Sequence, residues 1–317
     1  MATATAARHA SGDRASLYQE ITDRIIAELE QGRVPWVQPW GSVGLAAPLG
    51  LPQNAATGRK YGSINILILW SAVAERGFSG QRWLTFRQAL ALGGHVRKGE
   101  TGTTVVFADR FIPNRERARA EEAGEEPEAI PFLKRFTLFN TDQCEGLPAE
   151  AAPPPPEPLP ERRSLPQVEA LIRATGADIR IGGNRAFYMP STDHIQVPPM
   201  SAFFEPINWH RTVLHEMVHY TGHSSRLNRD QSGAFGSSAY SFEEIVAETG
   251  CAFLCASLSI IPTVRHSDYI GSWLDVLREN DRAIIRAASA ASKAADYLLA
   301  FLESNPATAA EEEAIAA

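Results

Sequence analysis

Two histidines and a glutamate in one short stretch have the types and the spacing of a metal site. His215, Glu216 and His219 form an H-E-x-x-H pattern. On a helix with about 3.6 residues per turn, positions i and i+4 lie on one face, so both imidazoles can point at one ion. A carboxylate beside that ion can take a proton from a metal-bound water, as in zinc peptidases. The sequence therefore predicts one Zn²⁺ per chain, with His215 and His219 as ligands and Glu216 as the catalytic base.

A catalytic zinc site needs a third protein ligand and leaves the fourth position for water. The candidates downstream are His223, Glu243, Glu244 and Glu248. Glu244 and Glu248 are four residues apart, so on a helix one can bind the metal while the other orients a ligand histidine. We favour Glu244 as the ligand, with Glu248 and His223 as residues behind the ligands or as alternative ligands. A competing interpretation places Glu244 in a capping box with Ser241, where it would serve only the start of the helix.

The predicted chemistry is hydrolysis of a peptide bond. Zinc lowers the pKa of its water to about 7, Glu216 takes the proton, and the hydroxide attacks the carbonyl that the metal polarises. Tyr188, Tyr240 or His223 could stabilise the resulting oxyanion, and the sequence does not choose among them.

The elements that must position these residues are two helices and a small sheet. Apolar residues accompany the histidines over residues 208–222, which predicts a buried helix that ends at Gly222. A second helix is expected over residues 241–258. Three short strands are expected at residues 178–181, 186–190 and 194–198. This C-terminal part is therefore predicted to be an α+β domain.

The N-terminal part is basic although the whole chain carries a net charge of −7. Residues 54–110 contain eight basic and three acidic residues, a local charge of +5. Cations in glycine-flanked turns suit phosphates, and exposed aromatic rings can stack on bases that are not already stacked in a duplex. The predicted partner is single-stranded DNA, bound by Arg59, Lys60, Tyr61, Asn65, Trp36, Trp40, Trp83, Arg97 and Lys98.

Composition and punctuation divide the chain into five parts. A run of prolines near residues 153–160 can only be an extended spacer. We expect an α+β fold with a disordered lead (1–15), a single-stranded-DNA-binding domain (16–150), a Pro-rich linker (151–163), a metallopeptidase domain (164–304) and a disordered tail (305–317). Within the first domain, two strands are expected on either side of a solvated loop at residues 113–128.

Three cysteines offer no disulfide framework, and the N-terminus lacks the apolar core of a signal peptide. The longest apolar runs fall short of the roughly 20 residues that span a bilayer. These features predict a cytoplasmic protein without a membrane role.

With these residues assembled, the chain resembles the ArdC-type antirestriction proteins of conjugative plasmids, whose N-terminal part is shared with TraC-type plasmid primases. The resemblance covers about residues 16–302. The motifs that carry it are Trp36-Val37-Gln38-Pro39-Trp40, Thr57-Gly58-Arg59-Lys60-Tyr61-Gly62-Ser63-Ile64-Asn65, Trp83-Leu84-Thr85-Phe86-Arg87-Gln88-Ala89, Gly94-His95-Val96-Arg97-Lys98-Gly99-Glu100, the H-E-x-x-H stretch through His223, and Phe242-Glu243-Glu244-Ile245-Val246-Ala247-Glu248.

The resemblance implies a single-stranded-DNA-binding domain joined to a zincin-like metallopeptidase domain. It implies action when plasmid DNA enters a recipient cell as a single strand and must escape restriction. The protein partner or substrate would belong to the host restriction or DNA-processing machinery. No region is left for primase catalysis. The alternative is a non-enzymatic protein that coats single strands and whose zinc domain is structural or a partner-binding surface.

Overall fold

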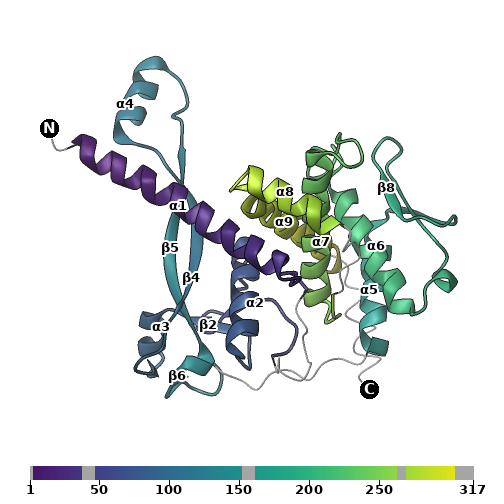
Figure 1. The fold of residues 1–317 in the computed structure, drawn as a ribbon, viewed down its shortest axis with the longest axis horizontal. Coiled ribbons are helices and arrows are strands. Elements are labelled where there is room, and N and C mark those ends of the chain that lie inside the picture. The colour runs from purple at the N-terminus through teal and green to yellow at the C-terminus, as the bar shows by residue number, and fades with distance from the viewer. Residues whose placement is uncertain (1–2, 38–46, 152–160, 263–268, 304–317) are drawn as a thin grey trace.

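The computed structural model describes residues 3–37, 47–151, 161–262 and 269–303 (Figure 1). The N-terminal half is built on a four-stranded sheet in the order β1-β2-β5-β4, flanked by helices. Its elements are α1 (Thr3–Glu30), β1 (Gln53–Asn54), α2 (Ile64–Arg76), β2 (Arg82–Leu84), α3 (Phe86–Ala91), β3 (His95–Val96), β4 (Thr103–Phe111), α4 (Asn114–Ala123), β5 (Ile130–Asn140) and β6 (Cys144–Glu145). An α+β domain at this end is confirmed.

The two longest strands, β4 and β5, form an antiparallel ribbon in which Val105 lies opposite Phe136. α4 caps its tip, where the sequence predicted a solvated loop over residues 113–128. That prediction was wrong, because ion pairs within the segment stabilise a helix, and apolar periodicity does not reveal such pairs. Arg119 bridges Glu116 and Glu125 at 2.8 and 3.0 Å. Charge pairs three residues apart stabilise one face of a helix even when it buries little.

α1 also differs from its prediction, since the helix starts at Thr3 and not at Ser16. The segment that was expected to be a disordered lead is rich in alanine. Alanine has the highest intrinsic helix propensity, so the segment can extend a helix without an apolar stripe of its own.

The C-terminal half places a three-stranded sheet beside a group of helices (Figure 1). In the order β7-β9-β8, the first pair is parallel and the second antiparallel. The elements are α5 (Glu161–Thr175), β7 (Asp178–Ile181), β8 (Phe187–Met189), β9 (His194–Val197), α6 (Pro206–Thr221), α7 (Ser238–Ser257), α8 (Ile270–Glu279) and α9 (Ala283–Glu303). α5 begins inside the predicted linker, while residues 152–160 and the predicted tail lie outside the described residues.

The two halves share one hydrophobic core. Trp36 packs against Trp273 of α8 with ring centroids 5.4 Å apart, and Trp70 of α2 meets Phe253 of α7 at 5.7 Å. Thr22 of α1 adds a hydrogen bond from its hydroxyl to the carbonyl of Asp281, between α8 and α9, at 2.7 Å. The proline segment therefore joins two bodies that are packed together.

Among the described residues, no helix combines the length and the apolar character that crossing a membrane requires.

Candidate functional site

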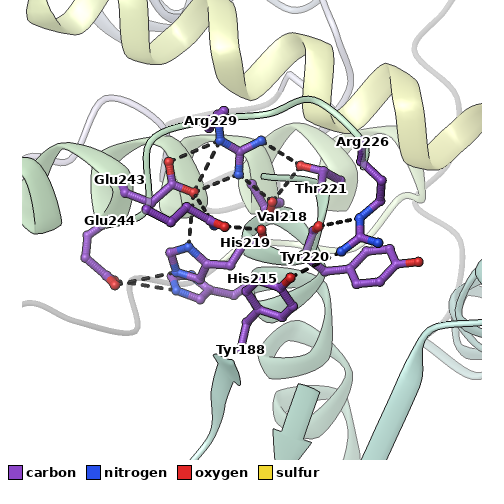
Figure 2. Close-up of polar contacts among 11 residues, drawn as sticks. Tyr188, His215, Val218, His219, Tyr220, Thr221, Arg226, Arg229, Glu243 and Glu244 are labelled. Atoms are coloured by element: carbon purple, nitrogen blue, oxygen red, sulfur yellow. Dashed lines mark hydrogen bonds and ion pairs between the residues drawn. The ribbon is translucent and has the colours of Figure 1, made fainter. Parts of the chain in front are cut away.

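α6 brings the two histidines of the H-E-x-x-H stretch onto one face. Pro206 occupies its first turn, where a missing N–H costs nothing, and its apolar side chains are buried in the core. The imidazole centroids of His215 and His219 lie 5.0 Å apart (Figure 2). The helix ends as predicted near Gly222, whose N–H donates to the His219 carbonyl at 2.7 Å.

α7 supplies the carboxylate that faces both rings. Glu244 Oε2 lies 3.6 Å from His215 Nε2, and Glu244 Oε1 lies 3.5 Å from His219 Nε2. One ligand atom from each of these three residues lies within 4.8 Å of the others. Two imidazoles and one carboxylate with an open fourth position are the donor set of a catalytic divalent metal, so these residues fit such an ion.

The start of α7 excludes the capping-box interpretation of Glu244. The N-cap is Ser237, whose hydroxyl accepts from the Tyr240 N–H at 3.2 Å, and the helix runs from Ser238. Glu244 therefore lies beyond the first turn and faces the histidines. The helix begins earlier than the predicted Ser241, and this moves Glu244 out of the position that a capping box requires.

The two alternative ligands, Glu248 and His223, are not part of the cluster of ligand atoms. Glu248 Oε1 approaches His215 Nδ1 at 3.7 Å, on the side of the ring away from Glu244. His223 bonds through Nδ1 to the hydroxyl of Ser225 at 2.7 Å and is not part of the cluster of ligand atoms. Glu248 thus has the position of a residue that orients a ligand histidine.

Glu243, counted among the candidate ligands, lies behind His219 (Figure 2). Its carboxylate is 3.3 Å from His219 Nδ1 and accepts from Arg229 Nη2 at 2.7 Å and from Gln231 Nε2 at 3.1 Å. Arg229 also donates to the Val218 carbonyl at 2.7 Å, which ties the loop between the helices to α6. Sequence reasoning missed Arg229 and Gln231, because nothing local marks two polar residues of a loop as partners of a helix.

The charges of the cluster are strongly coupled. Burial lowers the pKa of the His219 imidazolium, but hydrogen bonds to Glu243 and Glu244 outweigh burial and raise that pKa to about 10. Burial also opposes ionisation of Glu244, yet hydrogen bonds to His215 and His219 hold the pKa of its carboxyl well below the usual range. Ionised carboxylates beside buried rings make an environment that favours a cation.

A cavity of about 220 Å³ opens onto the cluster. Glu216 lines it and is only 4% exposed, so it is shielded from bulk solvent. Of the three predicted oxyanion partners, Tyr188 and Tyr240 line the cavity and His223 does not. The Tyr188 hydroxyl donates to Asp193 at 2.8 Å, and burial raises its pKa, so it stays protonated.

In the N-terminal half, the structure removes two aromatic residues from the predicted nucleic-acid site. Trp36 and Trp83 are both 0% exposed, and Trp83 packs edge-on against Phe78 at 5.7 Å. Neither ring can stack on a base, so their prediction was wrong. The sequence could not show this, because an aromatic residue beside cations gives the same local pattern whether its ring is exposed or buried. Trp40 lies outside the described residues.

Asn65 and Tyr61 serve the fold. The Asn65 amide donates to the Val106 carbonyl at 2.7 Å and accepts from the Val106 N–H at 2.9 Å, which satisfies the outer edge of β4. The Tyr61 hydroxyl, half-buried, accepts from Asn54 Nδ2 at 3.1 Å. Asn65 thus joins α2 to β4, and Tyr61 joins the basic turn to Asn54.

The predicted cations differ in how free they are to meet phosphates. Arg59 and Lys60 are exposed on the turn that follows β1. Lys98 is exposed as well, whereas Arg97 pairs with Glu100 at 2.6 Å.

Comparison with known proteins agrees with the division into two halves. Residues 166–290 match the zincin-like metallopeptidase family, and residues 15–139 match the N-terminal domain of anti-restriction factor ArdC. The fold and the site therefore define a two-domain α+β protein with a zincin-like metal-binding domain. The crystal structure of the metal-free antirestriction ArdC protein from plasmid R388 is 40% identical, with a TM-score of 0.74 over 90% of this chain and 97% of that one. The chain belongs to the ArdC antirestriction family.

Other relatives extend the comparison. The Mn(II)-bound structure of the same R388 protein superposes equally well, at 39% identity and a TM-score of 0.74, covering 90% of this chain and 97% of that one. An uncharacterised Sinorhizobium fredii protein, y4eC, is 39% identical over 89% of this chain and 91% of its own length. Two Escherichia coli DNA primases named TraC are each 35% identical over 90% of this chain, which spans 27% and 20% of their lengths.

Proposed function

We propose that this chain is an antirestriction protein that binds single-stranded DNA and hydrolyses a protein with a zinc-dependent peptidase site. The activity protects incoming plasmid DNA during conjugation. One observation supports the proposed peptidase activity. His215, His219 and Glu244 cluster together and line a cavity that Glu216 also lines. A metal site that serves structure alone does not need a carboxylate of this kind beside open space.

Each residue has a defined task. His215, His219 and Glu244 would hold the metal, which would supply polarisation of the scissile carbonyl and activation of water. Glu216, buried but open to the cavity, accepts the proton and passes it to the leaving amine. Glu243 keeps the ring of His219 aimed at the metal.

The nucleic-acid half rests on the cations of the N-terminal domain. Arg59, Lys60 and Lys98 are exposed and can neutralise phosphates. A relative named as a DNA primase shares this part of the chain. Binding to the strand would hold the peptidase near a protein of the host restriction or DNA-processing machinery.

Glu216→Gln tests the enzymatic half, because it keeps the size of the side chain and removes the base. We expect unchanged zinc content and DNA affinity, loss of proteolysis by at least about 100-fold, and loss of protection when the plasmid enters a restricting recipient. Transfer into a recipient without restriction enzymes provides the control. Full protection by this variant would overturn the peptidase proposal in favour of a protein that coats the strand.

Elemental analysis of the purified chain tests the choice of metal. We expect about one zinc per chain, because two histidines and a carboxylate in a tetrahedral set suit zinc. A stoichiometric content of manganese without zinc would contradict this choice.

A further inference from the structure

Two segments of the N-terminal half are joined into one surface by Asn54. Its amide donates to Gln88 of α3 at 3.1 Å and to the Tyr61 hydroxyl at 3.1 Å. Its carbonyl oxygen accepts from the Thr57 N–H at 3.1 Å. The basic turn and α3 are therefore held in a fixed relation to each other.

This surface carries positive charge in a chain that is acidic overall. Residues 54–62 and 85–96 contain no aspartate and no glutamate. Arg59, Lys60 and Arg87 are all exposed there. Burial raises the pKa of Asp296 on α9, and the charge of Lys60 opposes that rise, so Lys60 lies near one carboxyl of the C-terminal half. An anionic backbone is attracted to such a surface.

A phenylalanine stands out from the same surface. Phe86, the first residue of α3, is 50% exposed, and its ring is supported by Phe139 with centroids 6.4 Å apart. The capping box between Thr85 and Gln88 fixes the backbone from which the ring projects. Leu90, one turn later, is 52% exposed and extends the apolar area. An exposed apolar area of this kind is unfavourable in water and marks a site where a ligand can bind.

We infer that Phe86 is the residue on which an unpaired base stacks, while Arg87 and Arg59 contact the neighbouring phosphates. The inference rests on the proposed binding of single-stranded DNA and locates it. A ring on segments that carry exposed cations and contain no aspartate or glutamate of their own fits a single strand, since every base has a face for stacking and every link carries a negative charge. A duplex does not fit, because its bases are already stacked. Phe86 thus takes the role that the sequence assigned to Trp36 and Trp83.

Phe86→Ala in the full chain tests this, with Phe107→Ala as a matched control. Phe107, on β4, is 52% exposed and also meets a second phenylalanine edge-on, Phe136 at 6.3 Å. Fluorescence anisotropy with a labelled mixed-sequence single strand of about 20 nucleotides, long enough for one site, gives the dissociation constant. We expect Phe86→Ala to raise it about tenfold, equivalent to about 1.4 kcal/mol, and Phe107→Ala to leave it unchanged.

Salt dependence separates stacking from charge. Arg87→Ala should reduce the slope of log affinity against log salt by about 0.7, the value for one phosphate contact on a single strand. Phe86→Ala should weaken binding at every salt concentration without changing that slope. Phe86→Leu keeps an apolar side chain at the site and should also weaken binding, which guards against loss of folding as the cause.

The outcomes distinguish the two levels of the proposal. No binding by the unsubstituted chain would overturn single-strand binding altogether. Binding by the unsubstituted chain together with full affinity of folded Phe86→Ala or Phe86→Leu would overturn only the role of Phe86. An equal or larger loss in Phe107→Ala would place the stacking surface on the β4–β5 ribbon instead.

Discussion

Glu243 is not one of the three clustered ligand residues, yet it contacts one of the rings that would hold the metal. Its carboxylate meets His219 Nδ1 and receives hydrogen bonds from Arg229 and Gln231. Partners of this kind set the orientation of a ligand ring, and their loss weakens metal binding by about 10- to 100-fold. We expect Glu243→Gln to lower zinc affinity by about that factor, measured by competition with a chromogenic chelator.

Glu145→Gln is the matched control for this substitution. Glu145 approaches His95 at 3.5 Å, but both side chains are 58% exposed and far from the metal cluster in sequence. The zinc affinity of the Glu145→Gln variant should equal that of the unsubstituted chain. Equal affinity of Glu243→Gln and the control would show that Glu243 does not orient His219.

The raised pKa of His219 predicts how the metal-free protein responds to pH. With a folded pKa of about 10 against an ordinary value of 6.5, His219 is protonated near neutral pH and must lose its proton to bind a metal. Metal affinity should rise between pH 6.5 and 10, while the contribution of this proton to the stability of the metal-free fold falls over the same window. Titration calorimetry in buffers of different ionisation enthalpy measures the released proton, and the absence of release would contradict the prediction.

Single residues were predictable from the sequence where their role depends on local spacing. His215 and His219 lie on one face because helical periodicity places them so. The same rule placed Glu244 and Glu248 on one face of the next helix, but it did not choose between them as the ligand. Trp36 and Trp83 were mispredicted because exposure is decided by what the chain packs against them. Phe86 was overlooked for the converse reason, since a phenylalanine beside a helix start is ordinarily buried.

The crossing of α6 and α7 brings the ligands together, and Gly250 sets how closely the helices approach. A Cβ at this position would lie 2.9 Å from a Val218 methyl and 3.6 Å from the Ala291 backbone. Gly250→Val should therefore force α7 away from α6, because the β-branched side chain of Val218 cannot easily change its rotamer to make room. We expect a loss of roughly 1–3 kcal/mol in the free energy of unfolding together with weaker metal binding, measured by denaturant titration and by chelator competition.

A second substitution checks the cause. Val218→Ala creates space opposite Gly250, so the double variant should recover part of both losses. Additive losses in the double variant would show that crowding at this crossing is not responsible.

Helices with a buried stripe were predicted within a few residues, and those without one were not. α6 and α7 lie close to their predicted ranges, because apolar periodicity reports burial directly. The beginning of α1 and the whole of α4 escaped prediction, since alanine propensity and charge pairs stabilise them instead. The small C-terminal sheet was predicted as strands, but not its order, which depends on contacts between distant segments.

At the scale of the whole molecule, the contact of Trp36 with Trp273 makes the two halves interdependent. Removing the Trp273 ring leaves a cavity in the shared core, which costs about 3–5 kcal/mol. We expect Trp273→Ala to lower the denaturant midpoints of metal release and of DNA binding equally, although the residue contacts neither site. Phe107→Ala, at an exposed position, is the control. Two separate transitions in the unsubstituted chain would contradict a single cooperative unit.

The shared core also ties the lifetime of the protein to its ligands. A ligand that binds only the folded state stabilises it by RT ln(1 + [L]/Kd), about 2.7 kcal/mol at one hundred times Kd. Because one core serves both halves, a strand bound to the N-terminal domain would protect the peptidase domain from unfolding and degradation as well. If the chain binds single strands as proposed, conversion of the incoming DNA to a duplex removes that ligand and its stabilising effect. The protein would then unfold and be degraded faster once the single strand is gone.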